Sequence, residues 1–158
     1  MGQIPLYLSN NFIEWGIENN VPITQLKLQK LLYLYYARYC YKRNARPFDD
    51  CFVKWPYGPV LTGVYEQLKR FQAEPLRPLH DVADGKVTRI APSDEPFRSI
   101  FNDVVTRYGK LTASELVKLT HAGPDGLAYD TAWKKTQEMG SPLAASDIQE
   151  DGRVFFDV

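Results

Sequence analysis

The sequence predicts a mainly α, compact single-domain fold around one central hydrophobic helix, with a minor β-hairpin element. Three observations lead to this prediction. The chain has 158 residues, enough for one domain that buries a core without disulfides or metal. In the stretch 24–41, apolar side chains cover roughly 200° of a helical surface, twice the usual stripe. The rest divides at prolines and glycines into short segments with helical spacing. We therefore treat residues 1–158 as one domain.

The predicted central helix has a clear start and a clear end. Thr24 is a suitable N-cap, and Pro47 disfavours helical geometry at the residue before it. Its apolar arc consists of Leu28, Leu32, Tyr33, Tyr35, Tyr36, Ala37, Tyr39 and Cys40. The remaining sector carries a basic strip of Lys27, Lys30, Arg38 and Lys42. So wide an arc must be covered on most sides, and the strip then faces either solvent or a partner.

Helical spacing predicts further helices over residues 9–20, 60–71, 94–108, 113–121 and 128–139. Thr112 and Glu115 have the spacing of a capping box, as do Ser146 and Gln149. Gly152 is expected to interrupt the last segment, so that residues 154–156 form either helix or strand.

The β-hairpin is expected within the proline-containing segment 72–92. Residues 87–90 alternate in strand-like fashion after a turn at Asp84-Gly85. Residues 48–55 fit either a helical turn or a strand. Pro56 and Pro59 stiffen the connection that follows, in which Gly58 can adopt a positive φ.

The charge balance does not favour a nucleic-acid or membrane partner. Basic and acidic residues number 19 each, although residues 24–71 have a surplus of basic residues and 121–158 a surplus of acidic ones. Cys40 and Cys51 are predicted to be two buried thiols in a reducing compartment. With no membrane-length apolar run and no secretory signal at the start, we expect a cytoplasmic protein.

The sequence offers no convincing catalytic, cofactor or metal site. Neither His80 nor His121 lies at metal-ligand spacing from a cysteine or carboxylate. The spacing of Gly58 and Gly63 resembles a phosphate loop, but the Lys-Ser/Thr that must follow is missing. No serine has the flanking glycines of a nucleophile elbow. We therefore predict a non-enzyme without cofactor or metal, and a structural role for His121 near the end of its helix.

Several of these residues carry a resemblance to a known family. The helix motif is Leu26-Lys27-Leu28-Gln29-Lys30-Leu31-Leu32-Tyr33, and the loop motif, after Pro47-Phe48, is Trp55-Pro56-Tyr57-Gly58-Pro59-Val60 with Tyr65. A second motif follows in Leu116-Val117-Lys118-Leu119-Thr120-His121, with Trp133 downstream. In this order they resemble the Panacea domain of phage-associated proteins. The resemblance extends over roughly residues 9–156, and the gap between His121 and Trp133 is longer than the family pattern.

The resemblance implies an antitoxin that neutralises a protein toxin by direct binding, or an adaptor that delivers the toxin to a protease. A loop stiffened by two prolines can hold aromatic side chains ready for such binding. We expect partner contacts from Lys27, Lys30, Trp55, Tyr57 and Tyr65, and structural roles for Gly58, Pro59, His121 and Trp133.

Two alternatives remain open. One is a DNA-binding regulator of its own operon that uses the basic strip. The other is a hydrolase, which requires a pocket joining His121 to a carboxylate.

Overall fold

The computed structural model describes residues 3–158 and confirms a mainly α fold with a small β element. Within those residues there are seven α-helices and one two-stranded antiparallel sheet. The elements are α1 Ile4–Glu18, α2 Gln25–Arg43, β1 Val53–Trp55, β2 Gly58–Val60, α3 Thr62–Leu68 with a 3₁₀ turn Lys69–Phe71, α4 Phe97–Tyr108, α5 Ala113–Ala122, α6 Ala132–Lys135 and α7 Ala145–Asp157. No helix in this part of the chain has the length and apolar character needed to cross a bilayer.

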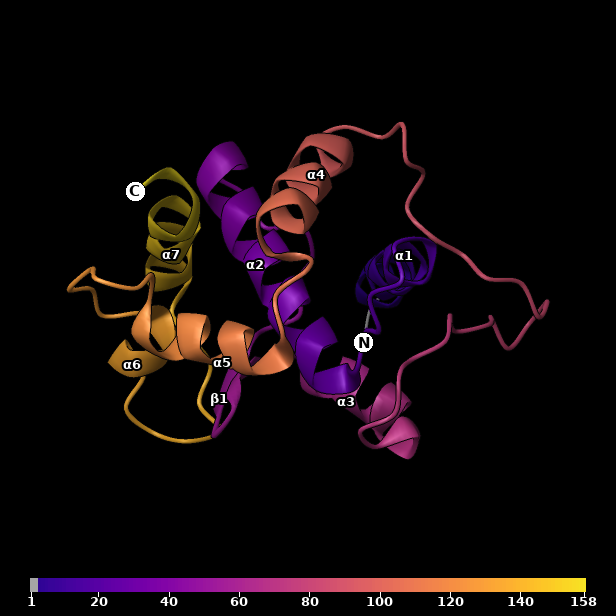
Figure 1. The fold of residues 1–158 in the computed structure, drawn as a ribbon, viewed down its shortest axis with the longest axis horizontal. Helices are drawn as coiled ribbons and strands as arrows, with labels where there is room; N and C mark the ends of the chain where they lie inside the picture. The colour runs from indigo at the N-terminus through magenta and orange to yellow at the C-terminus, as the bar shows by residue number, and fades with distance from the viewer. Residues whose placement is uncertain (1–2) are drawn as a thin grey trace.

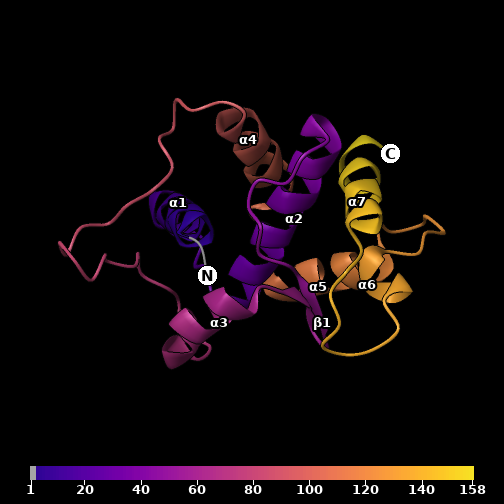
Figure 2. The same ribbon diagram turned by 180° about the vertical axis from the view of Figure 1, so that it is seen from behind.

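Helix α2 is the centre of the fold, as predicted. In Figures 1 and 2 it runs through the middle of the molecule, with α7, α4 and α1 around it and α5 across its lower half. Its side chains are buried on almost every side, and Leu28, Leu31, Leu32, Tyr33 and Leu34 have no exposed surface. A helix enclosed in this way explains why its apolar arc is so wide.

The predicted basic strip is the first correction. Lys27 and Arg38 are 4% and 7% exposed, and Lys30 has no exposed surface. Arg38 forms ion pairs with Asp103 of α4 at 3.1 Å and Asp157 of α7 at 3.0 Å. Lys30 and Arg38 thus join α2 to its neighbours through partners far away in the sequence, whereas Lys42 at the end of the strip is exposed.

Several helix boundaries follow from capping. The Thr24 hydroxyl accepts a hydrogen bond from the Lys27 N–H, and Thr112 with Glu115 forms the predicted capping box of α5. Helix α1 begins earlier than predicted, with Pro5 in its first turn. The capping box predicted in front of α7 is wrong, because the N-cap residue is Ala144.

Other predicted boundaries also need correction. Helix α7 continues through Gly152 to Asp157, so the tail is helical. The helix predicted over 128–139 is reduced to the four residues of α6, and Cys51 is exposed rather than buried.

The β-hairpin forms earlier in the chain than predicted. Strands β1 and β2 pair through Val53–Val60, Lys54–Pro59 and Trp55–Gly58, so that residues 56–57 make the turn. The other edge of β1 is covered by the segment before α7, since the Lys54 N–H donates to Ser141 O and Gly140 donates to Lys54 O. Neither edge of β1 is therefore free to pair with another chain.

The segment 72–96 contains no helix or strand, only a single bridge between His80 and Val87. It runs along α1 on the outside of the molecule (Figure 1). Asn10 bonds both the N–H and the carbonyl of Leu79, and Asn11 does the same for Ile90. These two buried asparagines fix the segment to the helical body in place of strand pairing.

Candidate functional site

The hairpin turn rests on α2 and α5. The Lys30 ammonium group donates a hydrogen bond to the carbonyl of Pro59 at 2.7 Å, inside the protein. Gly58 has φ of 113° and lies against both helices, and a Cβ placed on it would be 2.7 Å from Lys30 Cε and 2.9 Å from Thr120 Oγ1. Only glycine suits this backbone geometry and this separation. These contacts fix the position of the turn relative to α2.

The other side of the hairpin rests on α6. The indole N–H of Trp133 donates to the carbonyl of Trp55 at 2.8 Å. His121 stacks on the Trp133 ring with centroids 3.9 Å apart. Lys54 places its ammonium 4.1 Å from the centre of that ring and donates to the Thr136 carbonyl at 2.6 Å. Residues of α5, of α6 and of the chain just after α6 therefore support this side of the hairpin.

The support of the hairpin contains basic groups that lie close to one another. Burial lowers the pKa of Lys30 from 10.5 to about 7. Burial also lowers the pKa of His121, and the neighbouring charges of Lys30 and Lys54 lower it further. Within residues 3–158, His121 Nε2 is buried without a hydrogen-bond partner. Its neighbours are cations and an indole, so the carboxylate expected for a hydrolase site does not act on it.

An apolar groove opens on the outer face of the hairpin. It has a cavity volume of about 370 Å³ and lies between the start of α2, the hairpin turn and α3. Its apolar walls come from Leu26, Trp55, Pro56, Tyr57, Val60 and Tyr65, and Thr24, Gln25 and Gln29 also line it. Among the described residues, no charged side chain lines it. Such a groove can accept apolar side chains of another molecule.

The aromatic residues of the groove are arranged as a floor and a rim. Trp55 and Tyr65 meet edge to face, with ring centroids 4.9 Å apart and planes at 75°. Tyr57, at the tip of the hairpin, is 68% exposed. An exposed tyrosine on a rigid turn loses little conformational entropy when it binds a partner.

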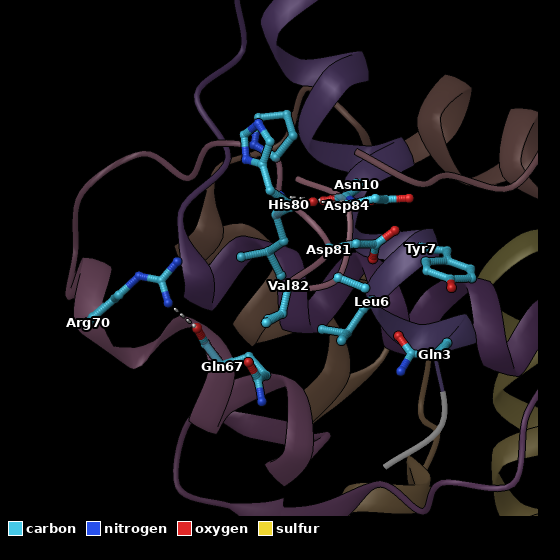
Figure 3. A pocket seen from close by; sticks show the side chains of 13 residues that line it. Gln3, Leu6, Tyr7, Asn10, Gln67, Arg70, His80, Asp81, Val82 and Asp84 are labelled. Carbon is cyan, nitrogen blue, oxygen red and sulfur yellow. Dashed lines mark hydrogen bonds between the residues drawn. The ribbon is translucent and has the colours of Figure 1, made fainter. Parts of the chain in front are cut away.

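A second, larger cavity lies between α1, the end of α3 and the segment 78–84 (Figure 3). Two of its polar side chains already have internal roles. Asn10 holds the backbone of Leu79, and Asp81 accepts a hydrogen bond from Thr88 at 2.5 Å. The cavity is the space beside a loop that these bonds hold in place. We therefore consider the apolar groove to be the better candidate site.

The family model described as "Antitoxin SocA-like, Panacea domain" matches residues 28–124. This range contains most of α2, the hairpin, α3, α4 and α5, and thus most of the groove. The chain belongs to the Panacea domain family. The resemblance predicted from the sequence motifs is confirmed.

One similar protein is Antitoxin SocA of Caulobacter vibrioides (strain NA1000 / CB15N), which is 26% identical over 122 residues. The alignment covers 73% of this chain and 63% of that protein, so this chain spans less than two thirds of its relative. No solved structure matches.

The Panacea motifs meet at the hairpin. Trp55, Tyr57 and Tyr65, three of the residues expected to contact a partner, line one groove. Lys30 cannot make the expected surface contact because its side chain is fully buried, and Lys27 exposes only 4% of its surface. Both lysines of the helix motif therefore lie in the interior of the domain, where Lys30 is hydrogen-bonded to the hairpin.

None of the four residues expected to be structural lines this groove. Gly58 and Pro59 contact Lys30, while His121 and Trp133 stack on each other. His121 and Trp133 are far apart in the sequence, but the chain between them turns back. The Thr131 hydroxyl donates a hydrogen bond to the His121 carbonyl at 2.9 Å. Trp133 itself lies outside the range of the Panacea match.

Sequence reasoning missed the α2 side of the groove. Gln25 and Leu26 lie at the start of α2, but their side chains do not stand out from the rest of the helix. Gln29 was also missed, and it exchanges two hydrogen bonds with the backbone of Leu61 at 3.2 and 2.9 Å. The one sequence signal for this side of the groove is the pair Gln25 and Gln29, which are four residues apart and therefore lie on one face of α2.

Proposed function

We propose that this chain is an antitoxin-type protein that neutralises a cognate protein toxin by binding it directly. Its mode of action is binding and not catalysis. Membership of the Panacea family supports this function, and the similar Caulobacter protein is itself named an antitoxin. The observation on which the proposal depends is the uncharged aromatic groove on a hairpin that is hydrogen-bonded to α2 and α6.

The toxin contact is proposed to centre on Tyr57, with Trp55 and Tyr65 below it. Tyrosine and tryptophan in a preformed site are the residue types that contribute most to protein–protein binding. The larger part of Trp55 and Tyr65 is covered by the domain itself, so the partner's apolar groups have to enter the groove to reach them.

Co-expression tests the function. The product of the adjacent gene is expressed from one inducible promoter and this chain from another, and growth is measured. We expect the adjacent product to stop growth alone and growth to return when this chain is present. An adjacent product that is harmless, or that remains toxic in the presence of this chain, contradicts the proposal.

Variants test the site. Tyr57→Ala removes an exposed ring and no internal hydrogen bond, and we expect it to weaken toxin binding about 30-fold. Met139→Ala is the matched control, because Met139 is 57% exposed and does not line the groove. Calorimetry with the purified toxin gives both dissociation constants. Equal values for the two variants place the contact elsewhere.

The fate of the toxin distinguishes two modes of action. If the chain blocks the toxin, toxin and chain accumulate together as a complex. If the chain delivers the toxin to a protease, the amount of toxin falls when the chain is induced and recovers when the protease gene is deleted. An immunoblot of the toxin during co-expression separates these outcomes.

A DNA-binding regulator has less support as the second candidate. It depended on the basic strip of α2, and Lys27, Lys30 and Arg38 are all buried. A shift of promoter DNA that weakens with salt, measured without the toxin, would revive it.

A further inference from the structure

The wall of the apolar groove contains an unsatisfied amide oxygen. The Gln25 side chain is only 8% exposed, and its Oε1 is buried without a hydrogen-bond partner among the residues described. A buried amide without a partner costs stability, and native proteins contain few of them. Gln29, one turn later, shows the contrast, because its amide is paired in both directions with Leu61.

The same wall also offers backbone donors. Thr24 caps the N–H of Lys27, and the Leu28 N–H bonds the Thr24 carbonyl. The N–H groups of Gln25 and Leu26 precede the first hydrogen bond of α2 and have no partner within the helix. This end of a 19-residue helix therefore presents donors beside the Gln25 amide, at the edge of an apolar groove.

We infer that the groove binds an uncharged peptide segment of the partner, with one apolar side chain on the Trp55–Tyr65 floor and the N–H and C=O of an adjoining extended residue bonded to the start of α2. The peptide N–H donates to Gln25 Oε1, and the peptide carbonyl accepts from the free N–H groups of α2. The last side-chain torsion of glutamine is soft, so the amide can turn its oxygen into the groove.

The mixture of donor and acceptor selects this occupant over an acidic one. A carboxylate, whether a side chain or a chain terminus, only accepts hydrogen bonds and leaves Gln25 Oε1 unpaired. A purely apolar ligand leaves both the oxygen and the helix donors unpaired. One extended residue, whose own N–H and C=O point to the same side, satisfies both at once, as the N–H and C=O of Leu61 do for the Gln29 side chain. This inference rests on the proposed function, for which it specifies the part of the toxin that is bound.

The test can be made before the toxin is identified. A library of twelve-residue peptides displayed on phage is selected on the wild-type chain, with Gln25→Met as the counter-selection target. The methionine keeps the length and the apolar part of the side chain but cannot form hydrogen bonds. We expect uncharged peptides with a large apolar residue, binding Gln25→Met about tenfold more weakly. Enrichment of acidic peptides, or no enrichment, overturns the inference.

An ester analogue then locates the bond. In the selected peptide, the N–H next to the apolar residue is replaced by an oxygen, which removes one donor. We expect about a tenfold loss of affinity for the wild-type chain and less than twofold for Gln25→Met. Equal losses for the two proteins show that Gln25 does not accept from the peptide, and the inference is then wrong.

Stability and toxin binding provide independent readouts. Because Gln25 Oε1 is buried without a partner among the described residues, we expect Gln25→Met to raise the melting temperature while it weakens peptide binding. A variant that is destabilised points to a structural role. If the toxin binds wild type and Gln25→Met equally but not Tyr57→Ala, the proposed function stands and this inference fails. If co-expression fails while the peptide arm succeeds, the proposed function is wrong and the groove chemistry stands.

Discussion

The phenol of Tyr33 in α2 donates a hydrogen bond to Asp151 in α7 at 2.5 Å, and neither side chain has any exposed surface. The other carboxylate oxygen accepts from the Tyr129 phenol at 2.5 Å, and the Ala132 N–H points at both oxygens. One buried carboxylate thus joins the central helix, the last helix and the start of α6. The short helix that carries Trp133, and hence the hairpin support, is anchored here.

Asp151 should make stability depend on pH. Burial raises the pKa of Asp151 from 3.8 to about 6, against the opposing effect of its hydrogen bonds. Between these values the folded protein holds a proton that the unfolded chain has released. The contribution of Asp151 to stability is therefore complete below about pH 4 and is lost as pH rises through about 6.

Asp151→Asn isolates this effect. The free energy of unfolding of the wild type, minus that of the variant, is expected to fall by about 2 kcal/mol between pH 4 and pH 7. Urea unfolding followed by tryptophan fluorescence measures it. Asp130→Asn, at an exposed carboxylate, is the control. A difference that does not vary with pH would show that Asp151 does not titrate in this range.

Lys30 should have the opposite pH dependence to Asp151. Burial lowers the pKa of Lys30 from 10.5 to about 7, so the unfolded chain binds more protons than the folded one between these values. Relative to Lys30→Met, the wild type should therefore gain stability as pH rises from 7 to 9, by no more than about 1.4 kcal/mol per pH unit.

Urea unfolding at several pH values checks the Lys30 prediction, with exposed Lys42→Met as the control. The loss of the Pro59 contact should also loosen the hairpin, seen as faster amide exchange in residues 53–60. A constant stability difference between wild type and Lys30→Met would mean that the ammonium stays charged inside the protein.

The central helix could be predicted from sequence because its arc of apolar side chains is local information. The role of its lysines could not. Helical spacing puts Lys27, Lys30 and Arg38 on one face, but the groups that cover them come from residues far along the chain, such as Pro59 and Asp103. A basic strip on a helix does not reveal whether it faces water or the interior.

The position of the hairpin shows that strands, too, cannot be located from local sequence alone. Residues 87–90 alternate like a strand, yet Asn10 and Asn11 bond the backbone groups around them from α1. The observed strands have three residues each, and one contains Pro59, so neither gives a strand signal by itself. The proline-braced turn and its aromatic residues were predicted, whereas the unpaired amide oxygen of Gln25 was not, because it depends on the three-dimensional surroundings of that side chain.

Gly152 sets the separation of α2 and α7. A Cβ on Gly152 would lie far inside contact distance of the Ala37 carbonyl oxygen and 3.0 Å from Tyr41 Cβ. Alanine favours a helix by about 1 kcal/mol over glycine, but here backbone atoms, which cannot rotate away, oppose it. We expect Gly152→Ala to destabilise the fold by about 2 kcal/mol or more, because α7 has to move away from α2.

Thermal unfolding measures the effect of Gly152→Ala, and Ser146→Ala at an exposed position of the same helix is the control. Movement of α7 would also lengthen the Tyr33–Asp151 bond, so the pH dependence that Asp151 gives to stability should weaken in the same variant. A Gly152→Ala protein that is as stable as the wild type would show that the two helices have room for a methyl group, contrary to the separation described here.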